Sequence, residues 1–211
     1  MTEASNKMLD QAIQNGMLVA YHAGRHPDRS AIVSNYGNRS FAELNANANR
    51  LVRLLAAQGI AEGDSVAVVC KNRPEFVEAL VATTRSGIRF TPINFHLKGE
   101  EIGYIVDNCE AKAFIADATL SAPAAEAAVL APGATTKLAV GGAIEGFDDY
   151  SSHFAEYEGY DIDNPTPGAR MLYTSGTTGR PKGVYRKERA ADTPVTGDAT
   201  AAYEAGDRDL C

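Results

Sequence analysis

The sequence predicts an α/β fold in which a mostly parallel sheet carries helices on both faces. Short runs of apolar and β-branched residues alternate along the chain with longer segments of helical periodicity. This alternation is typical of successive strand–helix–strand units, whose strands lie parallel to one another. The composition is that of a globular protein, because 45% of the 211 residues are apolar and 22% are charged.

The first part of the chain predicts a helix at residues 8–21, a strand at 31–33 and a tight turn at 36–39. A second helix, over residues 40–58, begins at Ser40. The Ser40 side chain caps the first turn, while Glu43, three residues later, reaches back to the cap N–H. Gly59 ends this helix. One face of the helix packs on a core and carries Phe41, Leu44, Ala48, Leu51 and Leu55.

The middle of the chain repeats a strand–helix cycle. The run 65–70 is almost uniformly apolar, which predicts a strand covered on both faces. A helix follows at 74–85, and its inward residues are expected to be Phe76, Val77, Leu80, Val81 and Thr84. Further strands are predicted at 89–94, 113–116, 137–140 and 170–174, and further helices at 99–108 and 121–130.

Charge limits the partners of this protein. The formal net charge is -7 and the isoelectric point is near 5.1, so the molecule as a whole repels nucleic-acid backbones and anionic lipid surfaces. No stretch approaches the roughly 20 apolar residues of a bilayer span, and the N-terminus lacks the pattern of a signal peptide. We therefore expect a cytoplasmic protein with no nucleic-acid partner and no transmembrane segment.

The cysteines, histidines and aspartates of this sequence are not arranged as catalytic or metal-binding sites. Cys70, Cys109 and Cys211 are an odd number without metal-ligand spacing, which favours reduced structural thiols. The four histidines stand beside neither a paired carboxylate nor a nucleophile motif, so each is expected at the surface or in a loop: His22, His26, His96 and His153. The aspartate pairs supply too few oxygen ligands for a Ca²⁺ loop. The sequence thus assigns no catalytic residue and no metal ligand.

One segment combines glycines, hydroxyls and a lysine in the pattern of a phosphate site. It reads Tyr173-Thr-Ser-Gly-Thr-Thr-Gly-Arg-Pro-Lys-Gly-Val184, and it lies within a stretch, 170–189, that contains six basic residues and one acid. Its glycines allow positive φ and close approach of backbone N–H groups to an anion, while Lys182 adds a mobile positive charge. It is not a Walker A loop, because Gly183 replaces the hydroxyl that follows the lysine there, and it lacks the G-x-G-x-x-G spacing of a Rossmann site.

This segment resembles the signature phosphate loop of the adenylate-forming (AMP-binding) superfamily, which includes acyl-CoA synthetases, luciferases and the adenylation domains of peptide synthetases. Other segments match that family in order and spacing: Ser40-Phe-Ala-Glu-Leu44, Gly63-Asp-Ser-Val-Ala-Val68, Asn72-Arg-Pro-Glu75, Thr91-Pro-Ile-Asn94 and Glu100-Glu-Ile-Gly-Tyr-Ile-Val106. Within the superfamily, Thr91-Pro-Ile-Asn-Phe-His-Leu97 and Lys182-Gly-Val-Tyr-Arg186 look most like fatty-acyl-CoA synthetases.

The resemblance implies a ligase that uses ATP, Mg²⁺ and coenzyme A to convert a carboxylic acid, with a fatty acid as the expected class, into an acyl-CoA through an acyl-adenylate. The nucleotide-binding residues that it implies are Thr174, Ser175, Gly176, Thr177, Thr178, Gly179 and Lys182.

The resemblance covers only the first part of the family's architecture. Residues 1–184 are therefore expected to be an incomplete N-terminal AMP-binding domain that ends in the phosphate loop, with 185–211 a truncated, polar, flexible segment. Such a fragment is expected to be inactive alone, with an apolar sheet edge exposed beyond residues 170–174. The alternative is a non-catalytic phosphate-binding or interaction module.

Overall fold

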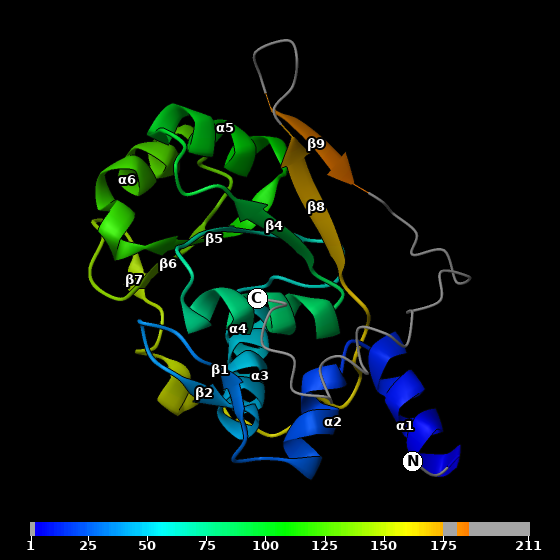
Figure 1. The fold of residues 1–211 in the computed structure, drawn as a ribbon. Helices are drawn as coiled ribbons and strands as arrows, with labels where there is room; N and C mark the ends of the chain where they lie inside the picture. The colour runs from blue at the N-terminus through cyan, green and yellow to red at the C-terminus, as the bar shows by residue number, and fades with distance from the viewer. Residues whose placement is uncertain (1–2, 175–180, 186–211) are drawn as a thin grey trace.

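The computed structural model describes residues 3–174 and 181–185, and its central feature is a seven-stranded sheet (Figure 1). The strand order is β7-β6-β5-β3-β4-β8-β9, and neighbouring strands are parallel except for β8 and β9. The strands are β3 (Ser65–Val69), β4 (Arg89–Ile93), β5 (Ala111–Asp117), β6 (Thr136–Val140), β7 (Asp148–Asp149), β8 (Ala169–Thr174) and β9 (Lys182–Tyr185). The predicted α/β class with a mostly parallel sheet is confirmed.

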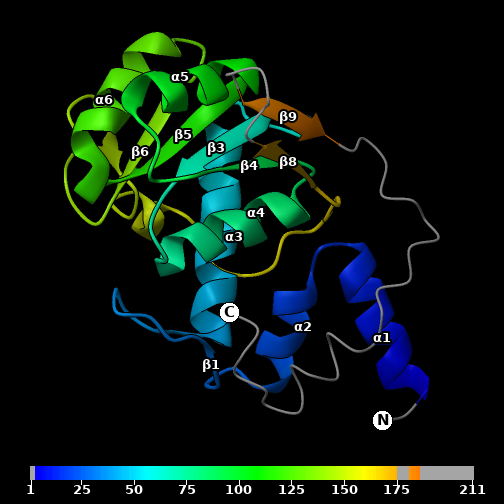
Figure 2. The same cartoon turned by 45° about the horizontal axis from the view of Figure 1, so that its top comes forward.

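Helices cover both faces of this sheet (Figures 1 and 2). On one face lie α3 (Phe41–Ala57) and α4 (Pro74–Arg85), and on the other lie α5 (Gly99–Asn108) and α6 (Ser121–Leu130). Short 3₁₀ helices span Ala118–Leu120 and Phe154–Glu156. β3 separates two hydrophobic cores, since Val66 and Val68 face the α3–α4 layer while Ala67 and Val69 face the α5–α6 layer.

The N-terminus of α3 shows how local sequence builds these elements. The Ser40 hydroxyl accepts a hydrogen bond from the Glu43 N–H (3.2 Å), and the Glu43 carboxylate accepts one from the Ser40 N–H (2.8 Å). This is the predicted capping box, which satisfies two N–H groups that a helix start leaves unpaired. The five residues predicted for the inner face of α3 are all buried.

The sequence predicts one helix in the N-terminal segment, at residues 8–21, but the segment forms two. Two helices, α1 (Glu3–Gln14) and α2 (Leu18–Arg25), are separated at Gly16, whose φ is +72°. A side chain at Gly16 would collide with the carbonyl oxygen of Thr84, so tertiary packing and backbone conformation both require glycine. The expectation that His22 lies at the surface is also wrong. His22 is 6% exposed, and its ring centroid lies 5.3 Å from that of Phe41, because α2 packs on α3.

Residues 30–40 form a separate two-stranded sheet, in which β1 (Ser30–Ile32) pairs antiparallel with β2 (Arg39–Ser40). At the other end of the main sheet, β9 pairs along β8. The expectation that β8 has no neighbour on its outer side is therefore wrong. The chain itself supplies that neighbour, because β9 begins at Lys182, eight residues after the end of β8 at Thr174, and runs antiparallel to β8.

An ion pair joins Arg73, the residue that precedes α4, to the buried Asp117 at the carboxyl end of β5. Arg73 Nε donates to Asp117 Oδ2 at 2.8 Å, and Asp117 Oδ1 accepts from the N–H and hydroxyl of Thr119, both at 2.9 Å. The Arg73 guanidinium also lies 4.2 Å from the centroid of the Tyr36 ring. Burial of Asp117 favours its neutral form, but the hydrogen bonds from Thr119 and Arg73 outweigh burial, so the pKa of Asp117 is lowered.

Asp117→Asn should therefore lower the free energy of unfolding mainly at pH values above about 4, where the carboxylate is ionised. Because the folded-state pKa of Asp117 is depressed, its stabilisation is complete above the unfolded pKa of about 3.9 and is lost as the pH falls through the lower folded value. We expect a loss of about 1.5–3 kcal/mol at pH 7, the range for hydrogen bonds to charged groups, that shrinks below about pH 4. Urea unfolding of wild type, Asp117→Asn and the exposed control Asp10→Asn at several pH values checks this. A loss independent of pH would contradict it.

Candidate functional site

The glycine-rich segment connects two strands of one hairpin. β8 and β9 are antiparallel, with Thr174 opposite Lys182 and Tyr173 opposite Gly183. The segment between them therefore starts and ends at adjacent backbone positions. Of the seven predicted nucleotide-binding residues, the structure describes Thr174 and Lys182 and places them side by side. The other five, Ser175, Gly176, Thr177, Thr178 and Gly179, lie outside the described residues.

The hairpin has one packed face and one exposed face. Met171 and Tyr173 pack against the core beneath α5, whereas Leu172 and Val184 are 52% and 51% exposed. Gly183 belongs to the packed face, and a Cβ there would collide with the Met171 methyl group and approach the Tyr173 ring to 3.0 Å. Gly183 therefore does not use the positive φ that the sequence allowed for the glycines of this segment. It lies in β9 without a positive φ, and its missing side chain makes room for Tyr173.

Tyr173 attaches the hairpin to the C-terminal end of α5. Its hydroxyl donates to Asn108 Oδ1 at 2.6 Å. Burial raises the pKa of Tyr173 above its ordinary value, so the hydroxyl keeps its proton at neutral pH and remains a donor. This contact fixes the strand residue that immediately precedes Thr174.

The hairpin is joined to the rest of the sheet over a short distance. β8 pairs with β4 through two residue pairs, Arg89 with Ala169 and Phe90 with Arg170. Beyond these pairs β8 continues past β4 toward α5 (Figure 1). Thr174 and Lys182 are both exposed at the far end of the hairpin, where a phosphate group in solution has access to them.

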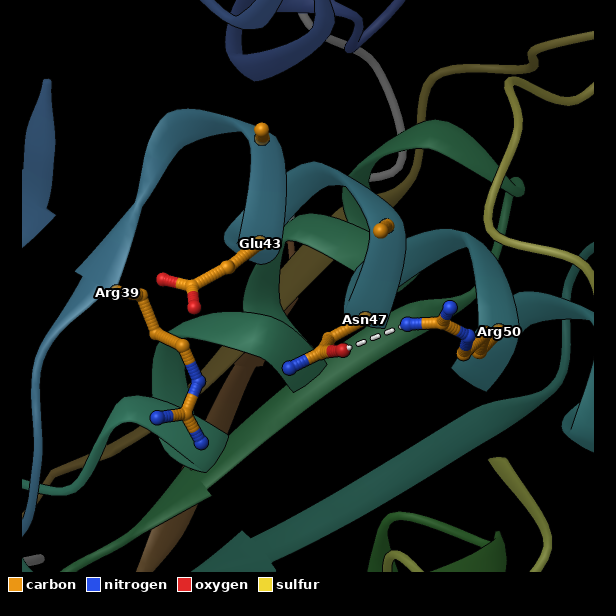
Figure 3. Close-up of a pocket in the computed structure, with 6 residues that line it drawn as sticks. Arg39, Glu43, Asn47 and Arg50 are labelled. Atoms are coloured by element: carbon orange, nitrogen blue, oxygen red, sulfur yellow. Dashed lines mark hydrogen bonds between the residues drawn. The ribbon is translucent and has the colours of Figure 1, made fainter. Parts of the chain in front are cut away.

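A concave surface lies away from the hairpin, on α3 and β2 (Figure 3). It is an open depression of about 510 Å³, lined by Arg39, Ala42, Glu43, Ala46, Asn47 and Arg50. Its arginines already have protein partners. Arg39 Nε pairs with Glu78 at 2.8 Å, and Arg50 Nη1 donates to Asn47 Oδ1 at 3.1 Å. These side chains hold neighbouring elements together, so the hairpin is the stronger candidate for a ligand site.

The remaining chemistry-bearing residues have structural surroundings. Cys70 and Cys109 are buried free thiols, as expected, and burial raises the pKa of Cys70 to about 12. Cys211 lies outside the described residues. Within residues 3–174 and 181–185, no three His, Cys, Asp or Glu side chains gather in a way that could hold a metal ion. In the same part of the chain, none of the helices combines the length and apolar character of a membrane span.

Solved structures share this fold. The inhibitor-bound N-terminal domain of FACL13 from Mycobacterium tuberculosis matches with a TM-score of 0.69 and 28% identity, over 82% of this chain and 44% of that one. The anthranilate CoA ligase AuaEII, in complex with anthranoyl-AMP, matches with a TM-score of 0.75 and 20% identity, over 82% and 34% of the two chains. The architecture is that of the N-terminal domain of adenylate-forming enzymes.

The sequence comparisons identify the family. The model of the AMP-binding enzyme family matches residues 19–209, and this chain therefore belongs to that family. A medium/long-chain-fatty-acid–CoA/3-oxocholest-4-en-26-oate–CoA ligase of Mycolicibacterium smegmatis is 31% identical over 169 residues, which are 75% of this chain and 30% of that protein. Surfactin synthase subunit 1 of Bacillus subtilis is 32% identical over 176 residues, which are 80% of this chain and 4% of that protein. The chain thus spans less than a third of either relative.

Tyr173→Phe tests the attachment of the hairpin. Removing the hydroxyl leaves the Asn108 amide without this donor, so we expect the free energy of unfolding to fall by about 0.5–1.5 kcal/mol, the net value of one hydrogen bond. Chemical denaturation of wild type, Tyr173→Phe and the control Tyr160→Phe measures the difference. Tyr160 is 64% exposed, so its variant should match wild type. Equal stability of all three proteins would show that the Asn108 contact does not anchor the hairpin.

Proposed function

We propose that this chain provides the phosphate-binding part of an AMP-forming acyl-CoA synthetase. The observation that carries the proposal is the β8–β9 hairpin, which brings Thr174 beside Lys182 at the two ends of the glycine-rich segment. Membership of the AMP-binding family and the likeness to CoA ligases support it. In this reaction a carboxylate attacks the α-phosphate of ATP, acyl-adenylate and pyrophosphate form, and the thiol of coenzyme A then takes the acyl group.

The residues of the glycine-rich segment suit a polyphosphate ligand. Backbone N–H groups beside the glycines and the hydroxyls of the threonines and Ser175 donate hydrogen bonds to phosphate oxygens, and Lys182 contributes a full positive charge. Negative charge grows on pyrophosphate as it leaves, so a lysine held against it stabilises the transition state more than bound ATP. Mg²⁺ would arrive with ATP and be held largely by its phosphates, because Mg²⁺ keeps water ligands and takes few protein carboxylates.

A fatty acid is the substrate class that we propose. The support is the fatty-acyl-CoA synthetase character of residues 91–97 and a ligase of medium- and long-chain fatty acids among the relatives. Peptide synthetases are equally similar in sequence, so amino acids are the comparison substrates in any assay. The non-catalytic phosphate-binding module is the alternative, and an assay for acid-dependent turnover distinguishes the two in a protein that carries the remaining segments of the family.

The 211-residue chain should not form acyl-adenylate by itself. We propose that residues outside this chain hold the adenine, the ribose and the acyl group, since the ligase relative is more than three times as long as the matched region. The measurement is pyrophosphate release with Mg·ATP, coenzyme A and a panel of fatty acids and amino acids, each with a no-protein control. Acid-dependent release above that control would refute the incompleteness of the chain and establish its substrate directly.

Lys182→Ala should weaken binding of Mg·ATP to the chain. The lysine supplies a charge-assisted hydrogen bond to phosphate, and we expect at least about a tenfold rise in Kd at low ionic strength. The matched control is Lys7→Ala, because Lys7 is exposed and belongs to α1, a helix that lies far from the hairpin in both views (Figures 1 and 2). Titration calorimetry gives the three affinities. An unchanged Kd in Lys182→Ala, or an equal loss in both variants, would remove Lys182 from the site.

A further inference from the structure

The segment that delivers the chain to β8 crosses the outer side of α3 and the end of α4. We refer to residues 157–168 as the strap; Figure 1 shows it as the yellow coil that runs below the helices before it turns up into β8. Five of its backbone carbonyls, those of residues 157–161, accept hydrogen bonds from side chains of α3. The contacts from α3 come from Asn49, Arg50 and Arg53. The strap is therefore docked on α3 through the backbone carbonyls of residues 157–161.

A buried arginine lies beneath the strap. Arg85, the last residue of α4, has no exposed surface. Its Nη1 donates to Asn45 Oδ1 at 2.8 Å and to Asn49 Oδ1 at 2.5 Å, whereas Nε and Nη2 are buried without a hydrogen-bond partner. Burial lowers the pKa of Arg85 to about 10, although the carboxylate of Asp161 opposes this effect. A cation in such surroundings is costly unless its charge is balanced nearby.

Two asparagines connect this arginine to the strap. Asn45 and Asn49 turn their oxygens toward Arg85 and their amide groups toward Asp161, whose Oδ1 accepts from Asn45 at 2.7 Å and from Asn49 at 3.1 Å. Asn49 also donates to the carbonyl of Gly159 at 3.0 Å. The side-chain amides of Asn45 and Asn49 thus bridge the positive charge of Arg85 and the negative charge of Asp161 by hydrogen bonds. Hydrogen bonds arranged in such a chain polarise one another.

The same arginine holds the other end of the strap through its backbone. The Arg85 carbonyl accepts from the N–H of Thr166 at 2.9 Å, and the Thr166 carbonyl accepts from Gly87 at 2.7 Å. Gly168 then donates to the Thr84 carbonyl at 2.9 Å. A side chain at Gly168 would collide with the carbonyl oxygens of Thr83 and Ile88, so the strap has no room to shift here. The next residue, Ala169, begins β8.

We propose that Arg85, acting through Asn45, Asn49 and Asp161, positions the base of the phosphate loop by fixing the strap. β8 has only two residue pairs with β4, so the path of the strap sets where the hairpin starts and in which direction Thr174 and Lys182 point. Arg85 is a positioning residue on this account, since its contacts are to the strap and to α3. The proposal rests on the proposed function of the loop.

The cost of the network indicates a role beyond filling space. An apolar side chain of similar volume would pack between α3 and α4 without leaving two guanidinium nitrogens unpartnered. Apolar contacts are not directional, so they would let the strap shift along α3. The hydrogen bonds that connect Arg85 to Asp161 are directional and can form in only one position of the strap. A fixed register is what a loop that must meet its ligand in one geometry requires.

Asp161 offers the test, because it is exposed and belongs to the strap rather than to the core. The variants are Asp161→Ala, Asp161→Asn and the matched control Asp163→Ala, a second exposed aspartate two residues further along the strap. Hydrogen–deuterium exchange of the 211-residue chain without nucleotide is measured for peptides covering the strap, β8 and α4. Calorimetric titration with Mg·ATP follows.

We expect exchange in the strap and in β8 to be about fivefold to tenfold faster in Asp161→Ala, with α4 unchanged, because local opening becomes easier while the core stays intact. Asp161→Asn, which keeps an acceptor but loses the charge, should fall between wild type and Asp161→Ala. Asp163→Ala should equal wild type. Affinity for Mg·ATP should fall in the same order.

The outcomes separate this proposal from the proposed function. Faster exchange in the strap but not in β8, or equal exchange in Asp161→Ala and Asp163→Ala, overturns the positioning role. If wild type does not bind Mg·ATP, the function of the loop fails, whereas the exchange of β8 still decides whether the network positions the hairpin. If Asp161→Ala unfolds, Asp161→Asn decides by the same comparison. Affinity lost in Asp161→Ala with unchanged exchange also refutes positioning, because Asp161 would then act on the ligand.

Discussion

The burial of β3 on both faces is the constraint from which the arrangement of the other elements follows. All five of its residues are without exposed surface, so each face of the strand needs a covering layer. From β3 the chain moves one strand outward to β4, then returns past β3 to β5. Because crossovers between parallel strands are right-handed, two moves in opposite directions place their helices on opposite faces. α4 consequently covers one face with α3, and α5 covers the other with α6.

The layer between α3 and α4 is held by polar contacts as well as apolar ones. Glu78 is 1% exposed and accepts hydrogen bonds from Arg39 (2.8 Å), Asn47 (2.8 Å) and Tyr150 (3.1 Å). These donors come from β2, from α3 and from the segment that follows β7. Arg85 similarly unites α3 with the strap. Two buried charges on α4, Glu78 and Arg85, thus join the β1–β2 sheet and the strap to the helices. Removal of one partner would leave the other charge buried and unpaired.

The candidate site depends on these contacts without being part of them. The β8–β9 hairpin reaches the sheet through two residue pairs with β4, the Tyr173 contact to Asn108 and the docked strap. Its far end presents Thr174 and Lys182 as exposed residues, which suits a segment that must admit and release a polyphosphate. A site on a loop needs a rigid support to hold its geometry, and here the support comes from α5, through Asn108, and from the α3–α4 side, through the strap.

The sequence by itself determined the α/β class, the order of the main strands and helices, the capping box at Ser40 and the membership of the AMP-binding family, because periodicity, turn chemistry and motif spacing are local properties. It did not determine the break at Gly16, the burial of His22 or the pairing of β9 with β8. It also predicted an inner face of α4 without Glu78 and Arg85, although both are buried. In the site, Thr174 and Lys182 are placed together, whereas the roles of the seven loop residues remain predictions. Tertiary structure alone decided the buried charges, because a charged side chain is buried only where distant partners meet it, and Asp161 is 76 residues from Arg85.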